Sequence, residues 1–265
     1  MPPDHTSLHV AARAALAESD VEAKLELTER LWADWQARAL EPGAFEDPEP
    51  LTEAGRPERP TLARPKDMPR RELNSPEGHA ALIHALTHIE FTAINLALDA
   101  VYRFHDLPAG FYADWLRVAA EEAYHYRLLR DHLRGLGHDY GDFPAHGGLW
   151  ETAMKTACDP LARMAVIPRY FEARGLDVTP GIQAKLRGYG DRAGGDILDI
   201  ILRDEIGHVA AGDRWFRYLC EARGLEPDAA YRTQIDAAGL PRPRKPFNEP
   251  ARVAAGFSPE ELARL

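Results

Sequence analysis

The sequence predicts an all-α protein centred on a pair of helical hairpins. Three observations support this fold class. Apolar residues recur at helical spacing through four long stretches, no segment keeps the two-residue alternation of a strand, and proline or glycine marks the breaks between stretches. With 265 residues and 45% hydrophobic content, the chain is long enough to bury a sizeable core. We therefore expect a globular helical protein.

The N-terminal part is predicted to be a helical extension followed by an arm. Residues 6–40 fit two short helices, and Asp20 is a plausible N-cap for the second. From Glu41 to Pro76, prolines recur too often for a helix or a central strand. We therefore expect residues 1–75 to form a helical N-terminal extension and a proline-rich arm that wraps over the body.

The first hairpin is predicted from residue 76 onward. Ser75 is suited to cap a long helix that begins with Pro76 and continues to about Phe104. The next helical stretch starts near Pro108 and is stopped by a glycine at position 135 or 137. Because the connection is very short, the two helices should run antiparallel.

The second hairpin follows the glycine-rich crossover GHDYGDFPAHGG. A helical stretch from about 149 to 174 should be interrupted or kinked near Pro160 and Pro168. The segment RGLDVTPG is expected to break the chain before a short helix that follows Pro180. A last long helix should end near Ala222. Residues 76–223 are thus predicted to form a four-helix bundle, with a proline-rich tail, 224–265, packed on it and a short helix from Ser258.

Composition narrows the classes of function. The net charge of -10 disfavours nucleic acid as a partner, and only the segment 56–71 is locally basic. The two cysteines, Cys158 and Cys220, form no CxxC motif and are expected to be buried small residues. No basic region precedes an apolar run at the N-terminus, and no stretch approaches the roughly 18 apolar residues of a membrane span. We expect a cytoplasmic protein without a membrane partner.

Two copies of a Glu-x-x-His motif stand out on the predicted helices. In EEAYHYRLLRDH, Glu122 and His125 share a face with apolar residues that normally meet a core. The stretch DEIGH repeats the pattern as Glu205 and His208. An acid and an imidazole on a core-facing stripe need a partner that compensates for their burial.

Each motif has a partner acid on another predicted helix. Glu90 lies on the apolar stripe of the first long helix, and Glu172 lies on that of the third. Glu90 precedes Glu122 by 32 residues and Glu172 precedes Glu205 by 33, a spacing that resembles an internal duplication. Two glutamates plus two Glu-x-x-His pairs form the ligand set of dinuclear carboxylate bundles.

Charge balance points to two metal ions in this set. Four glutamates carry a charge of -4 when both histidines are neutral, and two divalent cations would neutralise it. Oxygen and imidazole donors without thiolate suit iron or manganese, although zinc or cobalt could replace them in a purified sample.

Other polar residues beside the motifs have weaker assignments. Glu121 and Asp204 each lie four residues before a motif histidine and are candidates to accept its second ring N–H; the alternative is a surface acid. Tyr124 and Tyr170 are candidate redox-active side chains, with aromatic core packing as the alternative. His84 and His88 point away from the face of Glu90 and are interpreted as structural. The sequence singles out no catalytic side chain.

The stretches HIEFTAINLALDA, EEAYHYRLLRDHL and LRDEIGHVAAGDRWF resemble the ferritin-like superfamily, specifically a bacterial family known mainly by an unknown-function label. The resemblance covers nearly the whole chain, including RPERP, IPRYFEARGLDVTP and PFNEPAR. It implies a ferritin-like four-helix bundle with a dinuclear carboxylate site. In that superfamily the motif glutamates, here Glu122 and Glu205, usually bridge the metals, whereas Glu90 and Glu172 would be terminal ligands.

The resemblance favours an oxidase or oxygenase that activates O2 to oxidise a small organic substrate. Iron is the expected metal, with manganese or a mixed manganese and iron pair as alternatives. Two cysteines cannot build the four-cysteine iron domain of rubrerythrin-like peroxidases, so a separate electron donor is expected. The basic residues Arg242, Arg244, Lys245 and Arg252 are candidates to recognise an anionic substrate or partner.

Three alternatives stay open from the sequence. A manganese catalase-like enzyme would disproportionate peroxide with a similar ligand set. A hydroxylase that modifies tRNA uses the same fold, but the acidic charge balance argues against it. In a non-catalytic metal-binding or interaction protein, the ions would hold the bundle together while the N-terminal helices engage a partner.

Overall fold

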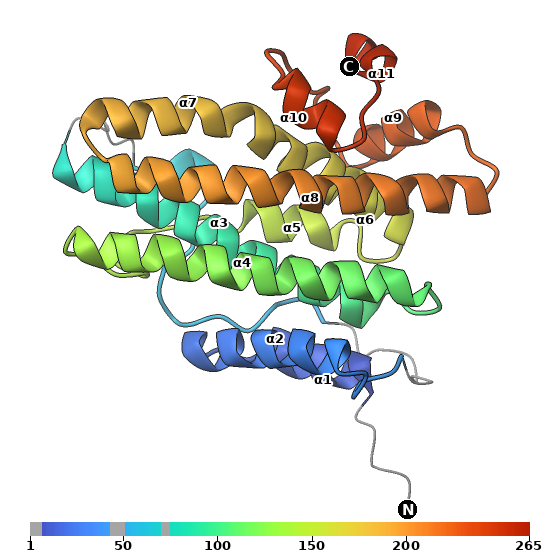
Figure 1. Cartoon of the computed structure of the whole chain (residues 1–265), viewed down its shortest axis with the longest axis horizontal. Coiled ribbons are helices and arrows are strands. Elements are labelled where there is room, and N and C mark those ends of the chain that lie inside the picture. Colours follow the sequence, from blue (N-terminus) through green and yellow to red (C-terminus); the bar gives the residue numbers. More distant parts are fainter. Residues whose placement is uncertain (1–6, 43–50, 70–74) are drawn as a thin grey trace, which may run out of the picture. The chain divides into compact units, whose positions relative to one another are not determined.

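A computed structural model describes residues 7–42, 51–69 and 75–265, which form helices joined by loops (Figure 1). These residues contain two isolated β-bridges and no strand, which confirms the all-α prediction. The chain divides into two compact units, Met1–Trp150 (unit 1) and Glu151–Leu265 (unit 2). The boundary falls inside the predicted 76–223 bundle, at the start of its second predicted hairpin.

Unit 1 consists of two helical pairs. In chain order its helices are α1 (Leu8–Ala17), α2 (Val21–Gln36), the 3-10 turn η1 (Pro65–Asp67), α3 (Pro76–Arg103) and α4 (Ala109–Gly135), and α5 (Gly148–Met154) spans the unit boundary. Helices α1 and α2 form a layer beside the long pair, with α1 against α3 and α2 against α4 (Figure 1).

The α3–α4 hairpin confirms the prediction for this part of the chain. Ser75 caps α3 by accepting a hydrogen bond from the Gly78 N–H at 3.0 Å, and Pro76 takes the first helical position. The connection is held by the Tyr112 hydroxyl, which donates to the Phe104 carbonyl (3.1 Å) and accepts from the Leu107 N–H (3.3 Å). This short loop turns the chain back and sets α4 against α3.

Helix α3 is the one described helix long and apolar enough to cross a membrane by length and composition. Of its most apolar 18-residue window, 67% is buried within the fold. A single helix of this length and composition is weak evidence for a membrane span, because mostly buried core helices pass the same test.

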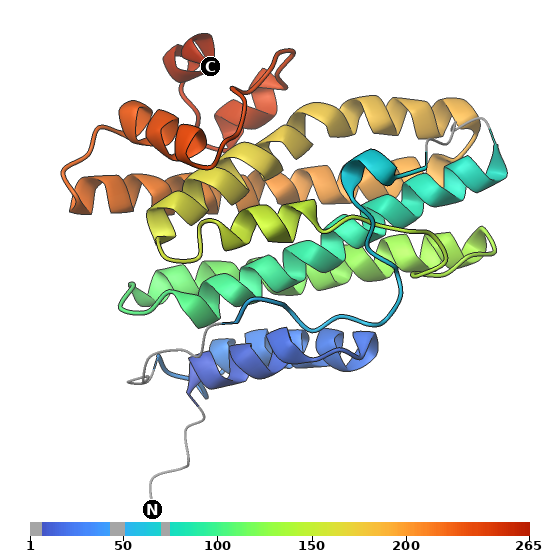
Figure 2. The same ribbon diagram turned by 180° about the vertical axis from the view of Figure 1, so that it is seen from behind.

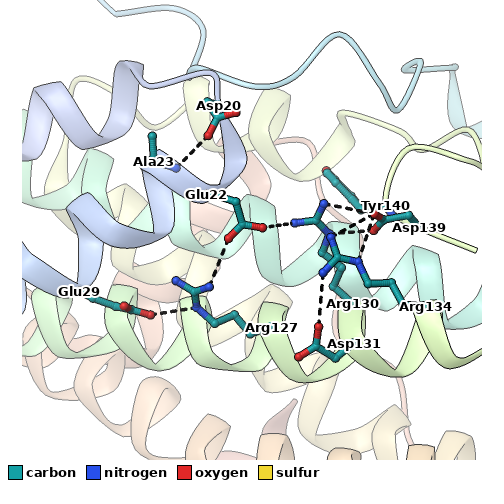
Figure 3. Close-up of polar contacts among 10 residues, drawn as sticks. All are labelled: Asp20, Glu22, Ala23, Glu29, Arg127, Arg130, Asp131, Arg134, Asp139 and Tyr140. Carbon is teal, nitrogen blue, oxygen red and sulfur yellow. Dashed lines mark hydrogen bonds and ion pairs between the residues drawn. The ribbon is translucent and has the colours of Figure 1, made fainter.

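Ion pairs join α2 to the outer face of α4 (Figure 3). The Arg127 Nε atom lies 3.0 Å from a Glu29 carboxylate oxygen, and Arg130 Nη1 lies 2.6 Å from Glu22. Arg130 also contacts Asp139 at 2.7 Å, in the loop that follows α4. Because these carboxylates are well exposed, each pair contributes little stability, but together they fix how α2 lies along α4.

A fully buried lysine, Lys24, ties α2 to α1 and α3. Lys24 Nζ donates to the carbonyl oxygens of Ala15 and Leu16, each at 2.9 Å, and to Asn95 Oδ1 at 2.7 Å. The three acceptors match the three N–H donors of an ammonium group. Burial lowers the pKa of Lys24 to about 7, and the negative charge of Glu18 partly offsets this decrease.

We expect Lys24→Met to lower the free energy of unfolding by about 2–4 kcal/mol at pH 6, where the lysine is protonated. Methionine fills a similar volume but donates to none of the three acceptors, so the Ala15 carbonyl and Asn95 Oδ1 lose the Lys24 donor, whereas the Leu16 carbonyl keeps the Gly55 N–H. Chemical denaturation checks this, with the exposed Lys155→Met as the control that should change little. An equal effect of the two substitutions would contradict the role assigned to Lys24.

The described part of the predicted arm, 51–69, runs as an extended segment over unit 1 (Figure 2). It contacts the end of α1 through Gly55, whose N–H donates to the Leu16 carbonyl at 2.8 Å. Farther along, Ala63 N–H donates to the Ala145 carbonyl at 2.8 Å, in a parallel bridge. The rest of the predicted arm, 43–50 and 70–74, lies outside the described residues, as do residues 1–6.

Unit 2 is built on the pair α7–α8. Its elements are α6 (Pro160–Val166), the π-helical turn η2 (Ile167–Glu172), α7 (Ala173–Tyr189), α8 (Arg192–Ala222), α9 (Pro227–Ala237), α10 (Glu249–Ala254) and α11 (Pro259–Arg264). The interruption predicted at Pro160 is found, since α6 begins there, and Pro168 lies within η2. Phe257 joins Leu176 and Val209 in one apolar cluster, so the tail contributes to the core.

The break predicted at RGLDVTPG is wrong, because α7 continues through Pro180. Proline lacks the N–H that would bond to the carbonyl four residues earlier, here that of Leu176. The side-chain amide of Asn248 donates to this carbonyl at 3.1 Å instead. A residue of the tail therefore supplies the hydrogen bond that the proline removes.

The tail is more helical than the sequence predicted. The short helix predicted from Ser258 is present as α11, and Ser258 Oγ accepts from the Glu261 N–H at 3.1 Å. Helices α9 and α10 were not predicted. Arg252, expected to be a candidate for anion recognition, is instead 1% exposed and pairs with Asp177. It is a structural residue.

Candidate metal centre

Unit 1 brings three predicted ligands together in its core. Glu90 lies on α3, whereas Glu122 and His125 lie one turn apart on α4. The Nδ1 atom of His125 is 3.5 Å from a Glu90 oxygen and 3.4 Å from a Glu122 oxygen. Ligand atoms of the three side chains all lie within 4.8 Å of one another. They form one compact group, the Glu90 cluster.

The helical pattern explains why this cluster is buried. Glu122 and His125 share their stripe of α4 with Ala119, Leu129 and Leu133, and all five residues are 0% exposed. The antiparallel hairpin then places Glu90, which is 6% exposed, opposite this stripe. The apolar residues that drive α3 and α4 together thus also enclose the acids.

The electrostatics of the cluster show its need for positive charge. Burial, together with the neighbouring charge of Glu122, raises the pKa of Glu90 well above its ordinary value. Burial alone would lower the pKa of His125, but hydrogen bonding to Glu122 and Glu90 raises it to about 11. Without a cation, the cluster thus favours bound protons.

The cluster fits a metal ion in donor type and spacing. Two ligand atoms that each lie about 2.1 Å from one ion are roughly 3.0–3.4 Å apart at octahedral or tetrahedral angles. The contacts of His125 with the two carboxylates are close to this range. Oxygen and imidazole donors without thiolate suit iron, manganese or zinc.

Unit 2 brings together the second motif. On α8, His208 Nδ1 lies 3.3 Å from a Glu205 oxygen, and His208 is 0% exposed. Glu172 is the last residue of η2 and is partly buried. Its grouping with Glu205 and His208 stays a prediction. Turns of π-helix are frequent at functional sites, because the extra residue reorients the side chains that follow.

Glu121 and Asp204, the predicted acceptors for the second ring N–H of His125 and His208, both contact arginines. Glu121 forms two contacts with Arg117 Nη1, at 2.8 and 3.0 Å, one turn earlier on α4. Asp204 contacts the adjacent Arg203 at 2.9 and 3.1 Å. Their role as acceptors for the ligand histidines therefore stays a prediction.

The two tyrosines named as redox candidates differ in their surroundings. Tyr124 is 48% exposed, with its ring centroid 6.2 Å from that of His125. This exposure does not fit the alternative of core packing. Tyr170 is partly buried, and burial raises its pKa against the opposing charges of Arg174 and Arg244. Redox activity of either residue stays a prediction.

His84 and His88 have the structural contacts expected of them. The Gly141 N–H donates to His84 Nε2 at 3.0 Å, and His88 Nδ1 lies 2.8 Å from the Tyr140 hydroxyl. Burial lowers the pKa of His88 to about 4, so its ring is neutral at physiological pH. Both rings hold the loop that follows α4.

The sequence patterns do not single out Arg169, although it lies in η2 three residues before Glu172. Its side chain is 1% exposed and pairs with Asp213 on α8 and Glu261 on α11. An arginine in an apolar stretch between Pro168 and Phe171 could have indicated a buried ion pair. Its partners, at positions 213 and 261, are too distant in sequence to be identified from a local pattern.

Comparison with known proteins places the chain in a family. The pattern of the family described as "Protein of unknown function (DUF455)" matches residues 17–263. A protein from Haemophilus influenzae described as uncharacterized is 48% identical over 213 residues, which cover 78% of this chain and 74% of that protein. No solved structure shows significant similarity. Because the match spans both units and the six predicted ligands, the chain belongs to the DUF455 family of proteins of unknown function.

Proposed function

We propose that the chain is a dinuclear metal protein with a ferritin-like bundle, to which each unit contributes half of the ligands. Unit 1 supplies the Glu90 cluster from α3 and α4. Unit 2 supplies Glu172 from η2 and the pair Glu205 and His208 from α8. Each half carries two carboxylates and one imidazole, so each balances the charge of one divalent cation.

The observation that carries this proposal is the burial of the Glu90 cluster. Two carboxylates held close together at 0–6% exposure would destabilise the hairpin unless a positive charge compensates for them. A divalent cation bound between α3 and α4 would neutralise both carboxylates and use the neutral form of His125. A purely structural role for three such side chains in the core would need protonation of one acid instead.

We further propose that the protein is an O2-activating oxidase or oxygenase with iron as its metal. Two ferrous ions, when bound, would supply two of the electrons that reduce O2, and the small organic substrate, which is oxidised, would supply the other two. The predicted ligands would hold the ions beside buried apolar residues of the helices, where water would be excluded from the reaction. Glu122 and Glu205 are proposed as bridges between the ions. A separate protein or small reductant returns the electrons.

Metal content gives the first test. We expect about two metal ions per chain after anaerobic loading with Fe(II) or Mn(II), because the four glutamates, two of them buried and two partly buried, need this compensation. Elemental analysis of the desalted protein measures the number, and anomalous scattering from crystals identifies the ligands. One ion per chain in a fully loaded sample, or ligands other than the six named here, would refute the dinuclear assignment.

Reactivity separates the oxidase from its alternatives. The iron-loaded protein is mixed with O2 and followed by optical and Mössbauer spectroscopy, and the manganese-loaded protein is mixed with peroxide. Rapid oxidation of the paired iron supports the oxidase or oxygenase. Rapid peroxide loss with manganese alone supports the catalase-like alternative. Two bound metals that react in neither experiment support a non-catalytic metal-binding protein.

A further inference from the structure

One buried arginine connects the tail to η2, the turn that carries Glu172. This arginine, Arg169, lies in η2 and pairs with Glu261 of the tail. Arg169 stacks over the rings of Phe216, Phe257 and Tyr231, at 4.6, 4.8 and 5.1 Å from their centroids. This aromatic enclosure leaves the guanidinium group 1% exposed. An arginine in such surroundings depends on its carboxylate partners, because water cannot solvate its charge.

Two carboxylates and two arginines form a closed network around this position. Asp213 and Glu261 both pair with Arg169. Each also pairs at 2.8 Å with Arg217, which comes from α8 and is 38% exposed. The charges balance, two against two. Glu261 is the one member that comes from the tail.

The backbone around this network leaves little room for movement. A side chain on Gly212 of α8 would collide with the ring of Pro168, so η2 approaches α8 as closely as a glycine allows. In the tail, Gly256 has a φ of +102°, and a Cβ there would lie 2.8 Å from an Asp213 oxygen. Glycine thus permits the turn that brings Ser258 and Glu261 over the network.

We propose that Glu261 is a positioning residue that holds Arg169 and thereby fixes the η2 turn in the form that presents Glu172. Arg169 and Glu172 lie in the same π-helical turn, so the position of one restrains the other. The inference rests on the proposed function, since it gives Glu172 the role of a metal ligand. In this role the tail helps to form the site, in addition to covering part of the bundle.

Arg217 provides a matched control for this role. It contacts the same two carboxylates as Arg169, but it lies on α8 and is partly exposed. If Glu261 serves only to dock the tail, Glu261→Gln and Arg217→Met should have similar effects on hydrogen exchange in η2 and on bound iron. If Glu261 acts through Arg169, only Glu261→Gln should change η2, because Arg217→Met leaves both carboxylates to Arg169.

The experiment compares full-length wild type, Glu261→Gln and Arg217→Met, each well below its midpoint of thermal unfolding. Hydrogen exchange is measured at the amides of 169–172, and iron content is measured after anaerobic loading. We expect Glu261→Gln to accelerate exchange by about tenfold or more. It should also reduce bound iron from two ions per chain toward one. Arg217→Met should change neither readout by more than about twofold.

The outcomes separate this inference from the proposed function. Wild-type exchange in Glu261→Gln, or equal acceleration in Arg217→Met, overturns the positioning role. Faster exchange with both irons retained overturns the link to Glu172. A wild-type protein that binds no metal overturns the proposed function, and the exchange comparison then still decides whether Glu261 fixes η2.

A second variant covers the case in which Glu261→Gln does not fold. The double substitution Arg169→Met and Glu261→Met removes both charges and replaces them with apolar side chains of similar volume, which buried sites often tolerate. Asp213 keeps Arg217 as its partner. Faster exchange at 170–172 in a folded double variant supports the positioning role, and wild-type exchange overturns it.

Discussion

Replacing Glu122 by alanine is expected to abolish binding of both metal ions. Glu122 is 0% exposed, lies 3.4 Å from His125 and is proposed to bridge the two ions. A bridging carboxylate contributes to both ions, so its loss should leave each with fewer ligands and with uncompensated positive charge. Elemental analysis of the loaded variant should find less than about 0.2 ions per chain.

Thermal unfolding should show that the same variant is not stabilised by added metal, although its metal-free form is at least as stable as the metal-free wild type. Metal bound to the wild type stabilises it by mass action, by about 4 kcal/mol per site at a thousandfold excess over Kd. In Glu122→Ala this increase should vanish. The metal-free variant should melt no lower than the metal-free wild type, because a buried carboxylate has been removed from beside Glu90.

Asp131→Ala is the matched control for Glu122→Ala. Asp131 lies on the same helix, but its side chain is 75% exposed. The control should keep both metals and the full metal-induced increase in melting temperature. If Glu122→Ala also retains two ions, the bridging assignment is wrong. If it retains one, Glu122 is a terminal ligand.

Replacing Arg252 by methionine is expected to lower the free energy of unfolding of unit 2 by about 3–5 kcal/mol. Arg252 contacts both oxygens of Asp177, at 2.9 and 2.8 Å, and both side chains are 1% exposed. The guanidinium also stacks over Phe247 at 4.5 Å. Methionine would fill part of the space but leave the carboxylate without this partner. Urea denaturation followed by circular dichroism measures the loss.

The tail supplies an exposed pair for comparison. Arg242 contacts Asp236 at 2.9 Å, with side chains 48% and 62% exposed. Arg242→Met should therefore cost less than about 1 kcal/mol. The double substitution Asp177→Leu and Arg252→Met should recover much of the loss, because it removes both buried charges. A small effect of Arg252→Met alone would show that Asp177 does not need this arginine.

The elements that could be predicted from sequence depend on neighbouring residues. Ser75 and Asp20 were identifiable as caps because a cap bonds to an N–H three residues ahead, at 3.0 and 2.9 Å here. Continuation of α7 through Pro180 could not be predicted in this way. The donor that replaces the missing proline N–H is Asn248, which is 72 residues away from the carbonyl it contacts.

The same distinction applies to the candidate site. Glu122 and His125 were predictable because helical spacing places them on one face, and Glu90 because it interrupts an apolar stripe. The partner of Glu121 was not predictable, because spacing of four residues allows either His125 or Arg117. The structure shows contacts with Arg117. Such a choice depends on rotamers and solvent, which a spacing rule does not contain.

Nearly every position of helix α4 is covered by neighbouring residues, and this coverage should limit which positions of the helix vary among relatives. Between residues 111 and 133, only Tyr124 and Asp131 are exposed; every other position is wholly or partly covered. Substitutions that drift neutrally should therefore accumulate at these two positions first. An aromatic residue retained at 124 while 131 varies would be evidence of selection on the chemistry of the ring, since packing does not require it there.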